Sequence, residues 1–62
     1  PEECEEIYRW LYDNLDIVAK NEDAQDKAVL IIKQGLVDHS FVADPEINLA
    51  SVMIKLARLS NA

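Results

Sequence analysis

Three observations predict that this chain folds as an all-α domain, a small three-helix bundle. Apolar residues recur at three- and four-residue steps over the first 20 positions, which is the spacing of one side of a helix. A run of five apolar residues, 28–32, spans more than a full helical turn and predicts a central helix without a broad solvated side. The tripeptide Asp-Pro-Glu at 44–46 is typical of a helix start, because it joins a capping carboxylate to proline at the first helical position. We expect helices at about 1–20, 23–35 and 45–59, packed around the second helix.

The first predicted helix begins with Pro1, which suits the first helical position, and with four glutamates, which the helix dipole favours there. Its apolar residues form one stripe: Cys4, Ile7, Tyr8, Leu11, Leu15, Val18 and Ala19. Trp10 and Ile17 lie well over about 90° from the centre of that stripe and, seven residues apart, share a second, narrower stripe. Either the rest of the chain packs against this helix on two sides, or the second stripe is a surface for a second chain. Tryptophan is a frequent anchor residue in protein–protein interfaces.

The second predicted helix begins near residue 23, where either Asn21 or Asp23 can cap it. We expect it to end at Gly35, the only glycine, in the left-handed conformation, with Leu36 folding back as an apolar contact. In an alternative, the helix continues to about Ser40.

A β-hairpin is the competing interpretation of this region, because valine and isoleucine favour strands and residues 28–32 could pair with 36–42. An isolated two-stranded hairpin is marginal, however, and residues 24–30 are rich in good helix formers. The helix is therefore the better prediction. The connection at 36–44 is apolar enough that we expect it to pack against the bundle.

The third predicted helix, 45–59, has apolar residues over about two-thirds of its circumference. They are Ile47, Leu49, Ala50, Val52, Met53, Ile54, Leu56, Ala57 and Leu59. Lys55 and Arg58 lie near its end, where the helix dipole favours cations, and Met53 is expected to be core filler. A three-helix monomer needs an apolar stripe of roughly 100° to 140° on each helix. Helices two and three exceed that, so we expect a partner chain to complete the bundle.

Length and cysteine content also point to a partner. Sixty-two residues make a single small domain, either processed at its start or a fragment of a longer chain, since Pro1 replaces an initiator methionine. A domain of this size buries only about 60% of the surface that its unfolded chain would expose. It usually needs a disulfide, a metal or a second chain for stability. Cys4 is the only cysteine and His39 the only histidine, so an internal disulfide and a structural zinc site are excluded, and no cofactor is expected.

The charge is unevenly distributed. Residues 1–26 hold nine acidic and two basic residues, a net charge of −7, whereas residues 27–62 hold three acidic and four basic residues, a net charge of +1. Such a chain repels phosphate groups, so direct nucleic-acid binding and anionic membranes are disfavoured, and a basic partner surface is the better match. No apolar run of about 18 residues could cross a bilayer, and the acidic start differs from a secretory leader. We therefore expect a soluble cytoplasmic protein.

No catalytic site is expected. Cys4 lies between two pairs of glutamates, whereas a reactive thiolate needs a positive environment. The consecutive Asp38, His39 and Ser40 supply the residue types of a hydrolytic triad, but neighbours in sequence point apart and no oxyanion-hole signature accompanies them. A carrier-type domain modified at Ser40 is a lesser alternative. In a carrier a helix should begin directly after the serine, whereas here the next one begins at Pro45.

The acidic residues of the first predicted helix form a candidate acidic surface. They are Glu2, Glu3, Glu5, Glu6, Asp13 and Asp16. No alternating Asp/Asn loop with a central glycine is present, so a calcium site is not expected, and a solvated helix face is the default interpretation. These carboxylates suggest an alternative function, an acidic inhibitor or nucleic-acid mimic that occupies a basic protein surface.

The function that these features favour is non-catalytic protein–protein interaction through apolar helix faces, as a homodimer or as a subunit of a larger complex. The hypothesis depends on the excess apolar circumference of the second and third helices and on the second stripe of the first helix. The candidate partner-binding residues are Trp10, Ile17, Leu30, Val37, Ile47 and Ile54.

Overall fold

A computed structural model describes residues 2–61, with only the backbone of Glu2. Pro1 and Ala62, and with them the prediction for Pro1 at a helix start, lie outside the described residues. The elements are α1 (Glu2–Asp13), α2 (Leu15–Val18), α3 (Glu22–His39) and α4 (Pro45–Ser60). Every regular element in the described part of the chain is a helix, so the prediction of a small all-α bundle is confirmed and the hairpin is excluded.

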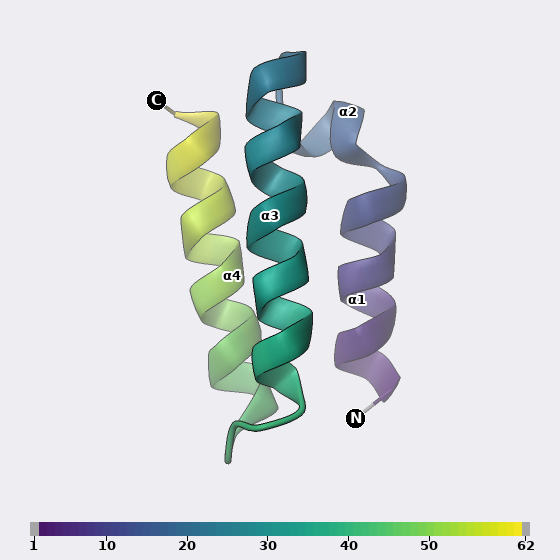
Figure 1. The fold of residues 1–62 in the computed structure, drawn as a ribbon, viewed down its shortest axis with the longest axis vertical. Helices are drawn as coiled ribbons and strands as arrows, with labels where there is room; N and C mark the ends of the chain where they lie inside the picture. Colours follow the sequence, from purple (N-terminus) through teal and green to yellow (C-terminus); the bar gives the residue numbers. More distant parts are fainter. Residues whose placement is uncertain (1, 62) are drawn as a thin grey trace.

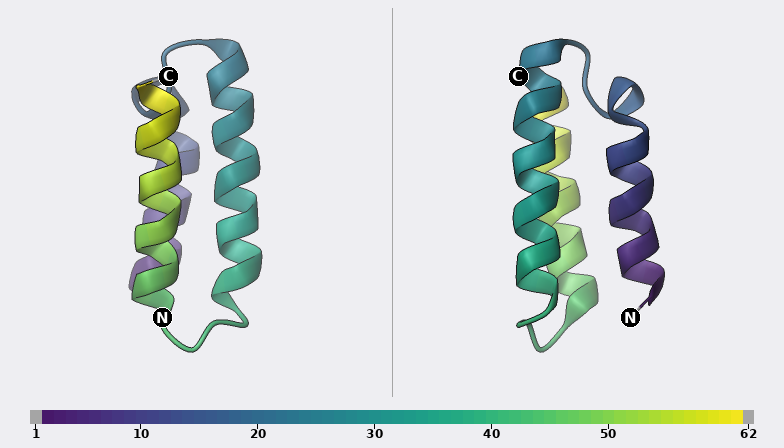
Figure 2. Two further views of the ribbon diagram at one scale, coloured as in Figure 1. Left: turned by 90° about the vertical axis from the view of Figure 1, so that its left-hand side faces the viewer. Right: turned by 45° about the vertical axis from the view of Figure 1, so that its right-hand side comes forward.

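The second long helix, α3, is the central element, as predicted. It runs antiparallel to α1 and α4 and lies between them in Figure 1. The turned view in Figure 2 (left) shows that α1 and α4 both lie on the same side of α3. The core joins these three helices and consists of Cys4, Tyr8, Leu11, Ala28, Ile32, Val52 and Leu56. The stripe predicted for the first helix supplies much of it, with Leu15 and Val18 partly buried, although Ile7 is 41% exposed.

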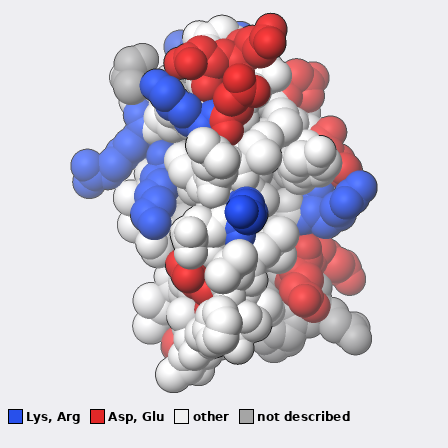
Figure 3. Space-filling model, viewed as in Figure 1, with Lys and Arg blue, Asp and Glu red and all other residues white. Residues whose placement is uncertain are grey.

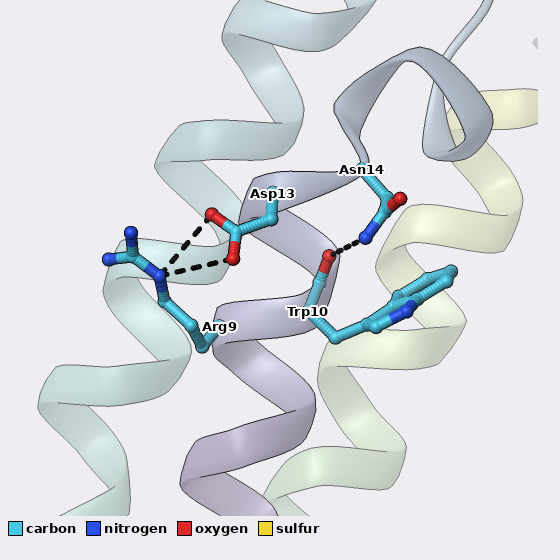
Figure 4. Close-up of polar contacts among 4 residues, drawn as sticks. All are labelled: Arg9, Trp10, Asp13 and Asn14. Atoms are coloured by element: carbon cyan, nitrogen blue, oxygen red, sulfur yellow. Dashed lines mark hydrogen bonds and ion pairs between the residues drawn. The ribbon is translucent and has the colours of Figure 1, made fainter.

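The first predicted helix is interrupted at Asn14, which corrects the expectation of one unbroken helix over 1–20. Asn14 has φ −124° and ψ 40°, and its backbone N–H donates to Leu11 O at 3.3 Å. Its side-chain Nδ2 donates to Trp10 O at 2.8 Å and so satisfies the carbonyl that a continuing helix would pair with the backbone (Figure 4). The chain then forms the single turn α2, so Trp10 and Ile17 lie on different helices.

The expected helix end at Gly35 is wrong, and the alternative of a longer helix is the one observed. Gly35 is buried inside α3, and no described glycine has a positive φ. An added Cβ would lie 2.5 Å from Val52 Cγ2 and 3.0 Å from Tyr8 Cε1, so glycine is needed for close helix packing and not for a turn. Leu36 remains on the helix at 42% exposure and does not fold back, and Ser40 caps the end.

The predicted caps at the helix starts are confirmed, with Asn21 as the cap of α3. Its side chain accepts a hydrogen bond from the backbone N–H of Ala24 at 2.8 Å. Asp44 accepts from the backbone N–H groups of Glu46 at 3.0 Å and Ile47 at 3.3 Å, with Pro45 in the first turn. Both starts are fixed by contacts within three residues, which is why the sequence predicts them well.

The close approach at Gly35 makes a specific stability prediction. In an exposed helix, Gly→Ala raises stability by about 1 kcal/mol through helix propensity. Here we expect Gly35→Ala to lower the free energy of unfolding by about 1–3 kcal/mol, because the new methyl group overpacks the core. Urea denaturation followed by circular dichroism measures the change.

The matched comparison repeats Gly35→Ala in a Val52→Ala background. Since Val52 Cγ2 is the atom nearest to the added Cβ, its removal should make the penalty of Gly35→Ala clearly smaller. If Gly35→Ala made the chain with Val52 intact more stable than the unsubstituted protein, the steric role of Gly35 would be contradicted.

Candidate functional site

The six candidate partner-binding residues are all exposed, but they do not form one surface. Their exposed fractions are Trp10 52%, Ile17 68%, Leu30 66%, Val37 44%, Ile47 69% and Ile54 56%. Leu30 and Val37 are seven residues apart on α3, and Ile47 and Ile54 are seven residues apart on α4. Each of these two pairs lies opposite the buried residues of its own helix. The pairs therefore face outward on different sides of the bundle. Partner binding by these residues stays a prediction.

Trp10 forms the rim of a groove between α1 and α4, here called the α1/α4 groove, with a volume of about 260 Å³. The groove is lined by Trp10, Leu11, Val18, Met53, Leu56, Ala57 and Ser60. Leu11 and Leu56 are each 4% exposed and belong to the core, so the groove reaches down to it. Figure 4 shows the Trp10 ring directed toward α4, away from Arg9.

Met53 is a correction to the sequence-based expectation of core filler. It is 44% exposed and lies on the groove wall contributed by α4, facing the wall that carries Trp10. On α4 it lies about 100° from Val52, which takes the buried position. The pattern of α4 is apolar on most sides, so it could not show which apolar residues face the core.

A second groove, here called the α1/α3 groove, has a volume of about 400 Å³ and was not predicted. It is lined by Glu5, Tyr8, Arg9, Tyr12, Val29, Ile32, Lys33 and Leu36. The guanidinium carbon of Arg9 lies 5.6 Å from the Tyr12 ring centroid. Arg9 also pairs with Asp13 at 3.3 Å (Figure 4). Glu5, Arg9 and Lys33 give the groove lining both signs of charge. The sequence holds one sign of this groove: Val29 and Leu36 are seven residues apart, which places both on the same side of α3.

Acidic side chains are exposed along the first part of the chain. Glu3, Glu5, Glu6, Asp13 and Asp16 are exposed, while the side chain of Glu2 lies outside the described residues. In Figure 3, acidic groups gather on the side of α1 and at the end where α3 begins, whereas basic groups gather on the side of α4. No group of three or more potential metal ligands is found within residues 2–61.

The consecutive Asp38, His39 and Ser40 are not linked to one another by side-chain hydrogen bonds. Asp38 accepts from Gln34 Nε2 at 3.0 Å, and Ser40 Oγ donates to Val37 O at 2.8 Å. The buried Nδ1 of His39 has no hydrogen-bond partner among the described residues. Ser40 therefore caps the end of α3, whereas a carrier-type serine precedes a helix.

Tyr8 forms a polar contact at the centre of the bundle. It is fully buried, and its hydroxyl accepts a hydrogen bond from Asn48 Nδ2 at 2.9 Å. The same Asn48 amide donates to Gly35 O at 3.0 Å, and the His39 ring meets the Tyr8 ring edge-on at 6.0 Å between centroids. Burial raises the pKa of Tyr8, Cys4 and Asp38 raise it further, and the Asn48 hydrogen bond opposes the shift. These contacts fix the positions of α1, α3 and α4, and hence of both grooves.

Comparisons with protein-family models, with curated proteins and with solved structures found no match. Within the described residues, no helix is both long and apolar enough to span a membrane. Besides the two apolar grooves, a hollow of about 240 Å³ lies between the start of α3 and the end of α4, and its lining includes the charged residues Lys20, Asp23 and Lys27. The polar side chains around Tyr8 lie inside the bundle.

The raised pKa of Tyr8 predicts alkaline destabilisation. Folding favours the protonated phenol, so its contribution to stability is fully present below the unfolded pKa of about 10 and is lost as the pH rises through the folded pKa. We expect the free energy of unfolding to fall between pH 9 and pH 11 more steeply than in Tyr8→Phe, as measured by urea denaturation at each pH. Equal slopes in the two proteins would contradict this.

Proposed function

We propose that this chain is a non-catalytic protein–protein association module that uses apolar helix surfaces. The observation that supports it is the distribution of apolar side chains over the outside of the bundle. Within the described residues, twelve large hydrophobic side chains are at least 37% exposed, whereas eight hydrophobic residues are buried. Large exposed apolar patches mark interaction sites, and helical spacing places Leu30 with Val37, and Ile47 with Ile54, on common exposed sides of their helices.

The positions of these residues favour assembly on more than one side. Leu30 lies on the outer side of α3, Ile47 and Ile54 lie on the outer side of α4, and Trp10 lies at the α1/α4 groove. Phe41, in the connection after α3, is 81% exposed, although the sequence predicted a connection packed against the bundle. We therefore place the chain in a homodimer or a larger complex, in the cytoplasm as its acidic sequence suggests.

Sedimentation velocity from low to high micromolar concentration tests self-association. We expect a shift from monomer to dimer or larger species, little affected by salt because the contact is apolar. A well-folded, monodisperse monomer at high micromolar concentration would count against the proposal.

Single lysine substitutions identify the surface. Leu30→Lys, Met53→Lys and Ile54→Lys each place a charge on a different side, and the one at the contact should weaken association about tenfold or more, because a buried apolar side chain contributes about 1.5–3 kcal/mol. Ser51→Lys, at an exposed polar position of α4, is the control.

An acidic inhibitor is the second candidate function, favoured by the exposed acidic groups on the side of α1 (Figure 3). Its binding to a basic protein should weaken steeply as salt rises, since screening acts on exposed charges. Salt dependence of any captured complex therefore separates the two candidates.

A further inference from the structure

We propose that the α1/α4 groove binds an amphipathic helix of a partner protein that carries basic residues at one end. This inference rests on the proposed function and narrows it to one surface and one kind of partner. Docking of an amphipathic helix into an apolar groove is a common mode of protein recognition. Apolar residues at helical spacing on the docked helix insert into the groove. Four observations on this groove support that occupant: its open side, its floor, its rim charges and its closed end.

The open side of the groove is a position where a fourth long helix could pack against α1 and α4. α1 and α4 run in the same direction on one side of α3, and no residue of α3 lines the groove. α3 therefore covers one side of the pair, and the groove lies on the other. A helix placed there would turn the three-helix arrangement into a four-helix bundle, whose helices bury their apolar sides against one another.

The floor and walls of the groove are apolar and reach the core. None of the seven lining residues is charged, and the floor contains the core residues Leu11 and Leu56. Trp10 and Met53 form opposing walls, a residue pair that gives large contact area and an adaptable surface. An inserted leucine or phenylalanine would thus contact the core directly.

Acidic side chains share the groove faces of both helices near their starts. Glu6 and Glu3 precede Trp10 by four and seven residues on α1, and Glu46 precedes Met53 by seven residues on α4. All three are exposed. The basic residues of these helices lie off this side: Arg9 lines the α1/α3 groove, and Lys55 and Arg58 are about 160° and about 140° from Met53 around α4. The rim charge is therefore negative.

The other end of the groove is closed by a hydrogen bond. Ser60 Oγ donates to Val18 O at 2.9 Å and ties the last turn of α4 to α2. Both residues line the groove. A docked helix would therefore extend toward the open, acidic end, where Glu3, Glu6 and Glu46 would face its charged residues. Complementary charge requires lysine or arginine at that end of the partner.

The test uses the single tryptophan of the chain as the probe. Trp10 is 52% exposed, so covering it should move its fluorescence emission to shorter wavelength. The titrant is a synthetic peptide of about 14 residues, roughly 21 Å as a helix, with leucines at helical spacing, lysines at one end and neutral polar residues elsewhere. The same peptide with glutamate in place of lysine is the charge control. The chain is held at a concentration where sedimentation shows a monomer.

We expect a saturable shift with the lysine peptide, weaker binding as salt rises, and no saturation with the glutamate peptide. Met53→Lys and Ala57→Lys, both on the groove wall, should each weaken binding about tenfold or more. Ser51→Lys is the matched control, because it adds the same charge at an exposed position of α4 about 160° from Met53, outside the groove lining, and should leave binding within about twofold. Circular dichroism of each variant verifies folding.

The inference is overturned if Trp10 shows no shift at high micromolar peptide, if both peptides bind equally, or if Ser51→Lys weakens binding as much as the two groove variants. These results are distinguishable from failure of the proposed function. A chain that self-associates but gives no Trp10 response keeps its association function and loses this partner. A monomer whose Trp10 response saturates keeps the groove and loses self-association.

Discussion

The absence of a side chain at Gly35 lets the Tyr8 ring and the Val52 methyl groups share one small space at the centre of the bundle, where an added Cβ would lie 2.5 Å from Val52 Cγ2. The amide of Asn48 then bridges the Tyr8 hydroxyl and the Gly35 carbonyl. One residue from α1, one from α3 and two from α4 thus meet at a single point. The distances among the three long helices, and with them the shapes of both grooves, depend on this contact.

The core that forms around this contact combines three smaller side chains, Cys4, Ala28 and Val52, with four larger ones, Tyr8, Leu11, Ile32 and Leu56. Ala28, Ile32 and Gly35 are the buried residues of α3, and the side chains nearest to Gly35 are those of Val52 and Tyr8. Larger apolar residues such as Leu30 and Ile54 are left on the outer sides of their helices. The packing that holds the three helices together therefore leaves apolar surface in contact with water, and the proposed association rests on that surface.

Trp10 shows how local and tertiary effects combine at the surface. Its position off the main stripe of α1 is a matter of helical spacing, and the sequence predicts it. The hydrogen bond from Asn14 Nδ2 to its carbonyl ends α1 and separates it from Ile17, which the sequence had placed on the same stripe. Met53 then becomes its neighbour, although 43 positions separate the two in the chain. The surface that results is a groove between two helices and not a stripe along one.

The sequence by itself determined the helical class, the cap at Asp44 and the side of α1 that enters the core, because these depend on contacts within a few residues. It left the cap of α3 open between Asn21 and Asp23, and the structure shows Asn21. It also placed Leu30, Val37, Ile47 and Ile54 among residues that the structure leaves exposed. Only the tertiary structure decided that α3 passes through Gly35, that Met53 lies on a groove wall, and that two grooves exist at all. A glycine can end a helix, or it can allow the side chains of other helices to pack closely against it. Which of the two occurs at Gly35 depends on Tyr8 and Val52, which are far from it in the sequence, so the residues around Gly35 could not predict it.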